Sequence, residues 1–164
     1  MIEIDKFVEV MAGAGVEYIL IGGMAARVHG SAQVTQDVDV VYSRSDANVT
    51  RLVSALATFE PYPRGAPPGL PFEWSVKTVK AGLNFTLTTT MGAIDILGEV
   101  AGGGRYEDLV AHAVTEAAFG HKIQLVSLPW LIRLKRAAGR PRDFNAIAEL
   151  ELLQSLASRT RAKT

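Results

Sequence analysis

The sequence has no cysteine, no net charge and no long uninterrupted hydrophobic run. Without cysteine, the chain can form neither a disulfide scaffold nor a cysteine-based metal site. The 17 lysines and arginines equal the 17 aspartates and glutamates, so the summed charge does not indicate a nucleic-acid partner. The longest uncharged stretches, such as residues 81–94, are shorter than the roughly 20 apolar residues of a membrane span, so we expect no membrane association. The N-terminus carries acids where a secretory signal needs bases, and we expect a cytoplasmic protein.

The composition is that of a globular protein. Hydrophobic residues make up 48% of the chain and charged residues 21%, which excludes a disordered or fibrous chain. We expect one domain over residues 1–164, with a core over about 1–127 and a basic helical segment over about 128–164. The charges are unevenly distributed, because residues 130–164 hold 8 bases and 3 acids while residues 1–129 hold 9 bases and 14 acids. The basic end either binds an anionic partner or consists of solvated helices.

Apolar periodicity and turn residues predict alternating helices and strands, with two helices at the C-terminal end. Helices are expected over residues 4–15, 24–29, 46–59, 106–112, 129–138 and 143–157. Strands are expected over residues 16–21, 37–42, 73–79, 83–89, 93–97, 114–119 and 123–126, and the last two form a hairpin around Gly120-His121. Residues 61–72 hold five prolines and two glycines, which predicts a long surface loop.

Asp37 and Asp39 form the most informative pair of residues. On a strand, residues two apart point to the same face, so these carboxylates lie side by side while Val38 and Val40 face the other way. Like charges this close repel each other, and a bound cation relieves the repulsion. Oxygen-only ligands select a hard ion such as Mg²⁺ or Mn²⁺. Two solvated acids on an edge strand are the alternative explanation.

Gly22 and Gly23 stand between a predicted strand and a predicted helix. Backbone N–H groups at a helix start bind phosphate, and glycine allows the phosphate to approach the backbone closely. The pair lacks the spacing of the Walker A and dinucleotide-binding glycine motifs. Taken alone, the pair is equally explained by a tight turn.

A third acid, Asp95, lies inside the apolar strand predicted over residues 93–97. An unpaired carboxylate in such a strand is costly, so Asp95 needs a partner. We therefore expect the strand of Asp95 beside the strand of Asp37 and Asp39, with the three carboxylates converging on metal. Asp95 is then also placed to accept the proton of an attacking hydroxyl.

Four segments follow one another along residues 16–150: Ile21-Gly22-Gly23, Thr35-x-Asp37-x-Asp39, Ile94-Asp95-Ile96 and Lys135-x-x-x-x-Arg140-x-Arg142-Asp143. In this order they resemble the nucleotidyltransferase superfamily that includes DNA polymerase beta, and within it the minimal, AbiEii-like toxin-type bacterial nucleotidyltransferases. The resemblance implies an α/β (α+β) fold whose mixed β-sheet is flanked by helices, with a C-terminal helical pair. It also implies two Mg²⁺ (or Mn²⁺) ions, an NTP as donor, and transfer of a nucleoside monophosphate with release of pyrophosphate.

The resemblance also implies a role for each residue of the first three segments. Gly22 and Gly23 would hold the triphosphate of the donor. Asp37 and Asp39 would ligate the metal ions, and Asp95 would complete the catalytic metal site and activate the acceptor. A hydroxyl residue precedes the acidic pair by two positions, and it would contact a phosphate or fix the loop; in this sequence that residue is Thr35.

Four further residues are candidates for nucleotide contacts. By the resemblance, Lys135 and Arg142 would neutralise the phosphates as charge develops on the pyrophosphate, and Asp143 belongs to the same segment. Arg27, one turn into the helix after the glycine pair, is a further candidate for phosphate contact. The alternatives are a solvated Arg27, a lysine that complements the end of a helix, and an aspartate that caps the last helix.

The acceptor is the least specified part of the prediction. An RNA such as tRNA, a protein and a small molecule all offer the required hydroxyl, and the fold does not choose among them. The toxin-type branch implies the toxin of a toxin–antitoxin pair, with a cognate antitoxin as partner. The alternative function is a non-catalytic nucleotide-binding or partner-binding protein on the same fold.

Overall fold

The strands form a seven-stranded mixed sheet and a small two-stranded sheet. The computed structural model describes residues 1–162 of the chain. Its strands are β1 (Tyr18–Ile21), β2 (Asp37–Tyr42), β3 (Tyr62–Pro63), β4 (Asn84–Thr89), β5 (Gly92–Leu97), β6 (Glu99–Val100), β7 (Gly104–Arg105), β8 (Ala113–Ala118) and β9 (His121–Val126). The large sheet has the order β3-β4-β5-β2-β1-β9-β8, and β6 pairs with β7. In the large sheet, β2 is parallel to β5 and β1 to β9, and the other neighbours are antiparallel.

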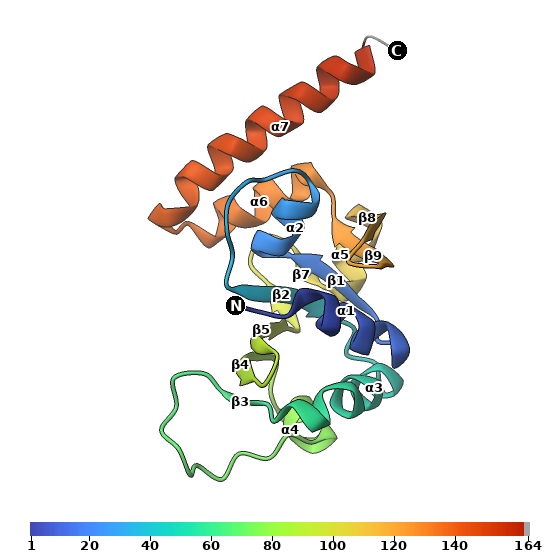
Figure 1. Ribbon diagram of the computed structural model, residues 1–164, viewed down its shortest axis with the longest axis vertical. Coiled ribbons are helices and arrows are strands. Elements are labelled where there is room, and N and C mark those ends of the chain that lie inside the picture. The colour runs from blue at the N-terminus through green and yellow to red at the C-terminus, as the bar shows by residue number, and fades with distance from the viewer. Residues whose placement is uncertain (163–164) are drawn as a thin grey trace.

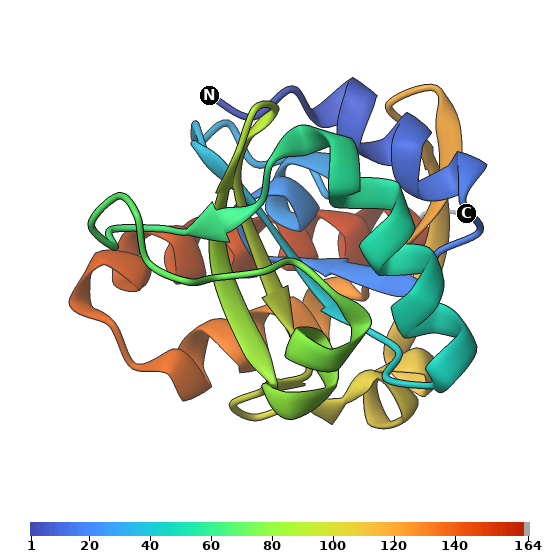
Figure 2. The same cartoon turned by 90° about the horizontal axis from the view of Figure 1, so that it is seen from below.

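Helices cover both faces of the large sheet. The α-helices are α1 (Ile4–Gly13), α2 (Gly22–Val28), α3 (Asp46–Leu56), α4 (Val76–Ala81), α5 (Tyr106–Leu109), α6 (Leu128–Ala138) and α7 (Phe144–Ala162). Short 3₁₀ helices span Ala57–Phe59, Val110–His112 and Pro141–Asp143. Figure 1 shows α1, α3 and α4 on one side of the sheet and α2, α6 and α7 on the other. In Figure 2, which is seen from below, α3 and α4 lie in front of the strands and α7 crosses behind them.

The two faces of β2 differ as the alternating sequence predicts. Val38 and Val40 are fully buried in the hydrophobic core, whereas Asp37 and Asp39 are half-buried on the opposite face. β1 lies between β2 and β9 in the interior of the sheet, which agrees with its continuous apolar sequence. The strand pair that carries the acids therefore sits at the centre of the fold rather than at an exposed edge.

A buried asparagine fixes the junction of β1, β2 and α3. Asn48 is fully buried, and its amide nitrogen donates to the carbonyls of Glu17 (2.9 Å) and Ser43 (2.7 Å). Its Oδ1 accepts from the backbone N–H of Glu17 at 2.7 Å. The N-terminus of α3 is closed by Ser45, whose hydroxyl accepts from the backbone N–H of Asn48. Every polar atom of this buried amide group is satisfied in this way, so the end of β2 is held in place.

The strand predicted over residues 73–79 is wrong, because residues 76–81 form helix α4. The hydroxyl of Ser75 accepts from the backbone N–H of Thr78 at 3.1 Å and caps the helix. The apolar side chains of Trp74 and Val79 contact the core from a loop and a helix instead of alternating along a strand. In so short a segment, capping and packing outweigh the strand preference of Val and Trp.

The loop predicted over residues 61–72 contains the edge strand β3. Pro63 is tolerated there because one side of an edge strand has no partner that needs a backbone N–H. The backbone N–H of Arg64 extends the pairing by donating to the carbonyl of Thr86 at 2.9 Å. The small hairpin of β6 and β7 was not among the strands expected from the sequence.

The predicted hairpin near Gly120 is confirmed as β8 and β9, with its turn one residue earlier than expected. Phe119 and Gly120 both have positive φ (53° and 79°), the conformation of a two-residue hairpin turn, and His121 already belongs to β9. The α/β (α+β) class, the mixed sheet flanked by helices and the C-terminal helical pair are also confirmed.

The C-terminal half of α7 extends away from the body of the molecule (Figure 1). Residues 155–162 are all exposed, and Arg159 and Arg161 lie on this part. Lys163, which belongs to the same basic sequence, lies outside the described residues. Within residues 1–162, no helix combines the length and the apolar composition that crossing a membrane requires.

Candidate active site

Three carboxylates meet where β2 and β5 run side by side. The parallel register pairs Asp39 with Asp95 and Asp37 with Ala93, which confirms the predicted neighbourhood of the two strands. Asp37, Asp39 and Asp95, called the acidic triad below, each offer one oxygen, and these oxygens all lie within 4.8 Å of one another. An all-oxygen set of this size fits a hard divalent cation such as Mg²⁺ or Mn²⁺.

Burial and crowding raise the pKa of Asp39 to about 8. The main cause is desolvation, which penalises the charged carboxylate. A hydrogen bond with Asp95 and the negative charges of Asp37 and Asp95 act in the same direction, while the positive charge of Arg140 opposes them. The acidic triad therefore holds a proton near neutral pH when no metal is bound.

Metal binding to the acidic triad should depend on pH because the bound proton of Asp39 must leave. The raised pKa means that Asp39 is mainly protonated below about pH 8 and ionised above it. We expect the affinity for Mn²⁺ to rise by up to about tenfold per pH unit between about pH 6 and pH 8, and to level off above that range. Mn²⁺ titrations at several pH values measure this dependence, and an affinity that stays constant over that range would contradict it.

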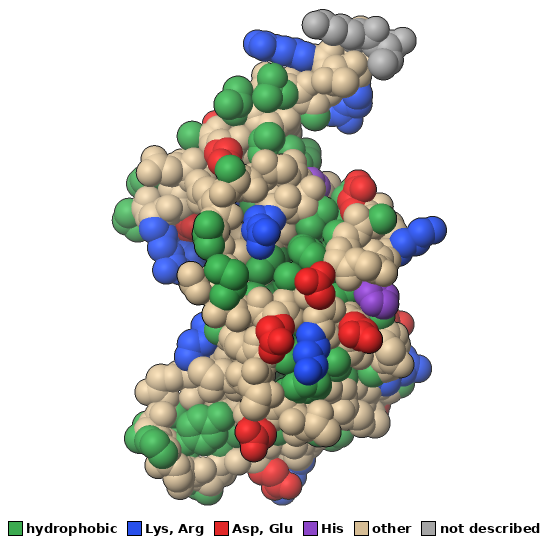
Figure 3. Space-filling view, viewed as in Figure 1, with side chains coloured by type: hydrophobic (Ala, Val, Ile, Leu, Met, Phe, Trp, Pro, Cys, Tyr) green, Lys and Arg blue, Asp and Glu red, His purple; other side chains and the backbone are tan. Residues whose placement is uncertain are grey.

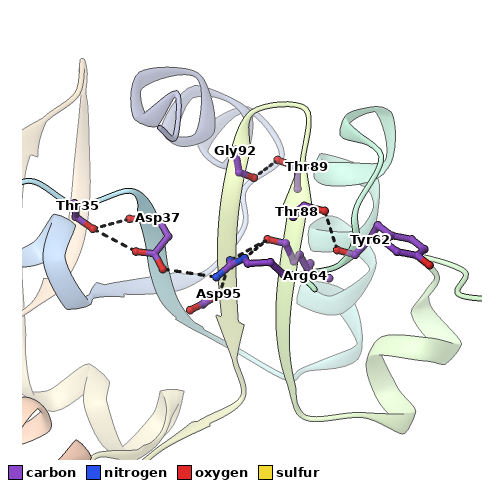
Figure 4. Close-up of polar contacts among 9 residues, drawn as sticks. Thr35, Asp37, Tyr62, Arg64, Thr88, Thr89, Gly92 and Asp95 are labelled. Carbon is purple, nitrogen blue, oxygen red and sulfur yellow. Dashed lines mark hydrogen bonds and ion pairs between the residues drawn. The ribbon is translucent and has the colours of Figure 1, made fainter. Parts of the chain in front are cut away.

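Gly22 and Gly23 allow the acidic triad to pack closely against the start of α2. Gly22 has a φ of +66°, and a Cβ built on it would overlap Asp39, lying 2.9 Å from its Cγ. A Cβ on Gly23 would overlap Thr35, at 2.8 Å from its Cβ. Thr35 in turn donates its hydroxyl to the backbone carbonyl of Asp37 at 3.2 Å and to its Oδ1 at 3.3 Å, as Figure 4 shows. The two glycines thus bring the backbone of α2 close to one predicted metal ligand, Asp39, and to Thr35, which hydrogen-bonds to another.

A second cluster of charges comes from α6 and the segment before α7. Asp143 is buried, and its Oδ2 accepts from Nε of Arg140 at 2.8 Å. The ammonium of Lys135 lies 3.9 Å from Oδ1 of the same carboxylate, and both of these side chains are about nine-tenths buried. A buried carboxylate between two cations fixes their positions, so Asp143 orients Lys135 and Arg140.

The acidic triad and this basic cluster line the same cleft, which has a volume of about 690 Å³. Figure 3 shows an indentation on one side of the molecule with basic side chains above and below it. Volumes of this size are typical of small-molecule sites. Nine of the ten predicted site residues line the cleft: Gly22, Gly23, Thr35, Asp37, Asp39, Asp95, Lys135, Arg142 and Asp143. Leu131, Leu134, Ala146 and Leu150 form an apolar part of the wall.

Arg27 is the predicted site residue that does not line this cleft. It is exposed near the end of α2, and its Nη1 donates to the sulfur of Met24 at 3.8 Å. Its phosphate contact stays a prediction. Among the described C-terminal bases, Arg159 and Arg161 also lie outside the cleft lining, and the last described residue that lines the cleft is Leu150.

Two charged residues of the cleft were not among the predicted site residues, Arg64 and Arg140. Arg64 follows β3 and contacts the acidic triad directly, with Nη2 at 2.7 Å from Oδ1 of Asp95 and Nη1 at 3.8 Å from Oδ2 of Asp37. It lies in a stretch dominated by proline and glycine, where no periodicity predicts a position. The only signal in the sequence is the need of three clustered acids for a counter-charge. Arg140 belongs to the C-terminal segment, residues 135–143, that resembles the nucleotidyltransferases, but the sequence alone assigned no role to it.

The chain was compared with known proteins by sequence and by structure. No protein-family model and no curated protein matches the sequence. The lincomycin-bound structure of the lincosamide antibiotic adenylyltransferase LnuA is similar over 92% of this chain and 97% of that protein, with a TM-score of 0.60 and 16% identity. An antigenic nucleotidyltransferase-like protein from Paracoccidioides brasiliensis is similar over 93% of this chain and 76% of that one, with a TM-score of 0.53 and 16% identity. The chain therefore has the nucleotidyltransferase fold.

Proposed function

We propose that the protein is a nucleotidyltransferase that depends on Mg²⁺ or Mn²⁺, with two ions, and moves a nucleoside monophosphate from an NTP to a hydroxyl acceptor. The observation that carries the proposal is the convergence of Asp37, Asp39 and Asp95 in a cleft that Lys135 and Arg142 also line. An NTP with its divalent cation needs such a combination, because the carboxylates bind the cation and the basic side chains bind phosphate. The shared fold supports this assignment.

The donor is assigned to the side of the acidic triad formed by α2 and α6. Gly22 and Gly23 lie at the start of α2 and line the same cleft, and Gly22 is next to Asp39, so a triphosphate bound there would be close to the metal ligands. Lys135 and Arg142 line the same cleft and would neutralise the outer phosphates. Asp143 contributes indirectly, because it holds Lys135 in position.

The proposed reaction is a displacement at the α-phosphorus of the NTP. The oxygen of the acceptor hydroxyl bonds to this phosphorus, and the bond from the phosphorus to the oxygen bridging the α- and β-phosphates breaks. Pyrophosphate leaves with the electron pair of the broken bond, while the carboxylate of Asp95 accepts the proton of the hydroxyl. A divalent cation bound at the acidic triad supplies charge neutralisation at the phosphate and lowers the pKa of the hydroxyl. Lys135 and Arg142 stabilise the charge that develops on pyrophosphate.

The acceptor is proposed as a class, a molecule that presents a hydroxyl group. A small molecule is the first choice to test, because the structurally similar LnuA is an antibiotic adenylyltransferase. An RNA such as tRNA and a protein hydroxyl are the other acceptors. A toxin role with a cognate antitoxin, a cytoplasmic location and the action of residues 1–164 as one domain stay predictions from the sequence.

Calorimetric titration with ATP, CTP, GTP and UTP tests the proposed site. We expect the wild-type protein to bind at least one of them only when Mg²⁺ is present. Asp37→Ala combined with Asp39→Ala should weaken this binding by at least about tenfold, because two of the three ligand carboxylates are removed. The matched control is Asp5→Ala combined with Asp46→Ala, which removes two exposed acids from α1 and α3. NTP binding that is unaffected by the loss of Asp37 and Asp39 would contradict the proposal.

Catalysis requires a second measurement on the same protein. Incubation with an α-phosphate-labelled NTP and a cell extract, followed by separation of RNA, protein and small molecules, shows which class of acceptor becomes labelled. Label on any of the three supports the transfer reaction and names the acceptor class. Tight NTP binding without any labelled acceptor would favour the non-catalytic nucleotide-binding alternative.

A further inference from the structure

The guanidinium group of Arg64 lies on the acidic triad. Its Nη2 is 2.7 Å from Oδ1 of Asp95 and donates a hydrogen bond to it, and its Nη1 is 3.8 Å from Oδ2 of Asp37. Figure 4 shows the side chain of Arg64 crossing β5 to reach both carboxylates. One cation from outside β2 and β5 thus contacts two of the three predicted metal ligands.

The position of Arg64 is fixed by the edge of the sheet. Its backbone N–H donates to the carbonyl of Thr86 at 2.9 Å, directly after the pairing of β3 with β4. Its side-chain Nε and Nη2 both donate to the carbonyl of Leu87, at 3.3 Å and 2.9 Å. Backbone groups of β4 therefore hold both the main chain and the guanidinium, so the contact with the triad is built into the fold rather than made by a loose surface side chain.

The charges of this arrangement compensate one another. The three carboxylate oxygens lie within 4.8 Å, a separation at which like charges repel strongly. The side chains of Arg64, Asp37 and Asp95 are 29%, 33% and 21% exposed, so solvent screens this repulsion only in part. A guanidinium bound to Asp95 and close to Asp37 supplies a positive charge at the place where a divalent cation would supply it. The guanidinium and the cation therefore compete for the same carboxylate oxygens.

We propose that Arg64 is an internal counter-ion that a divalent cation must displace from Asp95 before the metal site is complete. This inference rests on the proposed function, in which the acidic triad binds metal. Arg64 then acts as a positioning residue: it keeps Asp95 and Asp37 turned toward each other without metal, and it sets the concentration of metal at which the site fills. The edge strand β3 directly before it pairs with β4 and so brings this side chain to the triad.

A titration with Mn²⁺ in the absence of nucleotide, monitored by electron paramagnetic resonance, tests the inference. Arg64→Gln removes the charge and keeps a polar side chain of similar length, and we expect it to bind Mn²⁺ about tenfold more tightly than the wild-type protein. Arg64→Lys keeps the charge but not the planar fork, so its affinity should lie between the two. The control Arg51→Gln removes an exposed arginine from α3 and should stay within about twofold of the wild type. Thermal unfolding of each variant verifies that it is folded.

The outcomes separate this inference from the proposed function. If the wild type binds Mn²⁺ and Arg64→Gln binds it equally or more weakly, Arg64 is not a competing counter-ion and the inference is overturned. The same follows if Arg51→Gln tightens binding as much as Arg64→Gln, because the effect is then one of overall charge. If neither the wild type nor Arg64→Gln binds Mn²⁺ at millimolar concentration, both the proposed metal site and the inference fail.

Discussion

Asp95→Asn should reduce nucleotidyl transfer by about 10³-fold while NTP binding changes by no more than about threefold. The amide keeps the shape of the side chain but can neither accept the proton of the acceptor hydroxyl nor contribute a negative charge to a metal ion. Asp37 and Asp39 remain for binding, so the loss should fall on the reaction step. Label transfer from an α-labelled NTP and calorimetric NTP titration measure the two quantities separately.

The matched control for this variant is Asp46→Asn. Asp46 lies at the start of α3, its side chain is 85% exposed and it pairs with Lys80 at the surface. The Asp46→Asn variant should therefore transfer nucleotide at the wild-type rate. A rate for Asp95→Asn within about tenfold of the wild type would show that Asp95 is not the proton acceptor, because general bases contribute more than this.

Gly22→Ala should weaken Mn²⁺ binding by about tenfold to 100-fold, which is the range for residues that support metal ligands. The new Cβ would overlap Asp39, so the carboxylate has to turn away from Asp37 and Asp95. The positive φ of Gly22 (+66°) adds a backbone strain of about 1 kcal/mol for any other residue. Mn²⁺ titration of the folded variant measures the effect on the site.

Gly15→Ala separates backbone strain from the displacement of Asp39. Gly15 has almost the same φ (+67°), but a Cβ built on it meets nothing within 4 Å among the described residues. Both variants should lose free energy of unfolding through the same backbone strain, Gly22→Ala at least as much as Gly15→Ala, and only Gly22→Ala should lose affinity for Mn²⁺. Equal metal affinity in the two variants would mean that Asp39 is not required where the structure places it.

The acidic site was predictable because its geometry follows from local rules. The alternation along β2 places Asp37 and Asp39 on one face, and the apolar surroundings of Asp95 require a partner for its carboxylate. The register that pairs Asp39 with Asp95 then follows from bringing these acids together. The C-terminal charged residues are also evident from the sequence, but the burial of Asp143 between Lys135 and Arg140 could not be predicted from it.

Arg64 could not be predicted because it depends on a long-range pairing. Its neighbours along the chain are prolines and glycines that predict a loop, whereas its position is set by β3 pairing with β4 more than 20 residues later. Helix α4 was missed for a different reason, since a serine cap and the packing of Val79 decide a six-residue segment. For Arg64 the deciding contact is distant in the sequence, whereas for α4 a local serine cap outweighs the strand preference of the segment.

The net charge is zero, but the acidic triad and the C-terminal basic side chains of the cleft come from different parts of the chain. The acidic triad lies on β2 and β5, whereas Lys135, Arg140 and Arg142 line the cleft from α6 and the segment after it, where Lys135 and Arg140 pair with the buried carboxylate of Asp143. The more distal bases of α7 do not take part in this arrangement. Among the described C-terminal bases, those that line the cleft all lie between residues 135 and 142.

A crystal structure with Mn²⁺ and a non-hydrolysable NTP analogue, with anomalous data recorded for manganese, tests the metal site most directly. We predict manganese peaks ligated by Asp37 and Asp39, with Asp95 on one of the two ions at about 2.1 Å, and the triphosphate between the acidic triad and Lys135. Arg64 should have left Asp95 in that structure. A nucleotide bound in the cleft without manganese at the three carboxylates, or manganese and nucleotide bound elsewhere on the molecule, would contradict the proposed metal-dependent function.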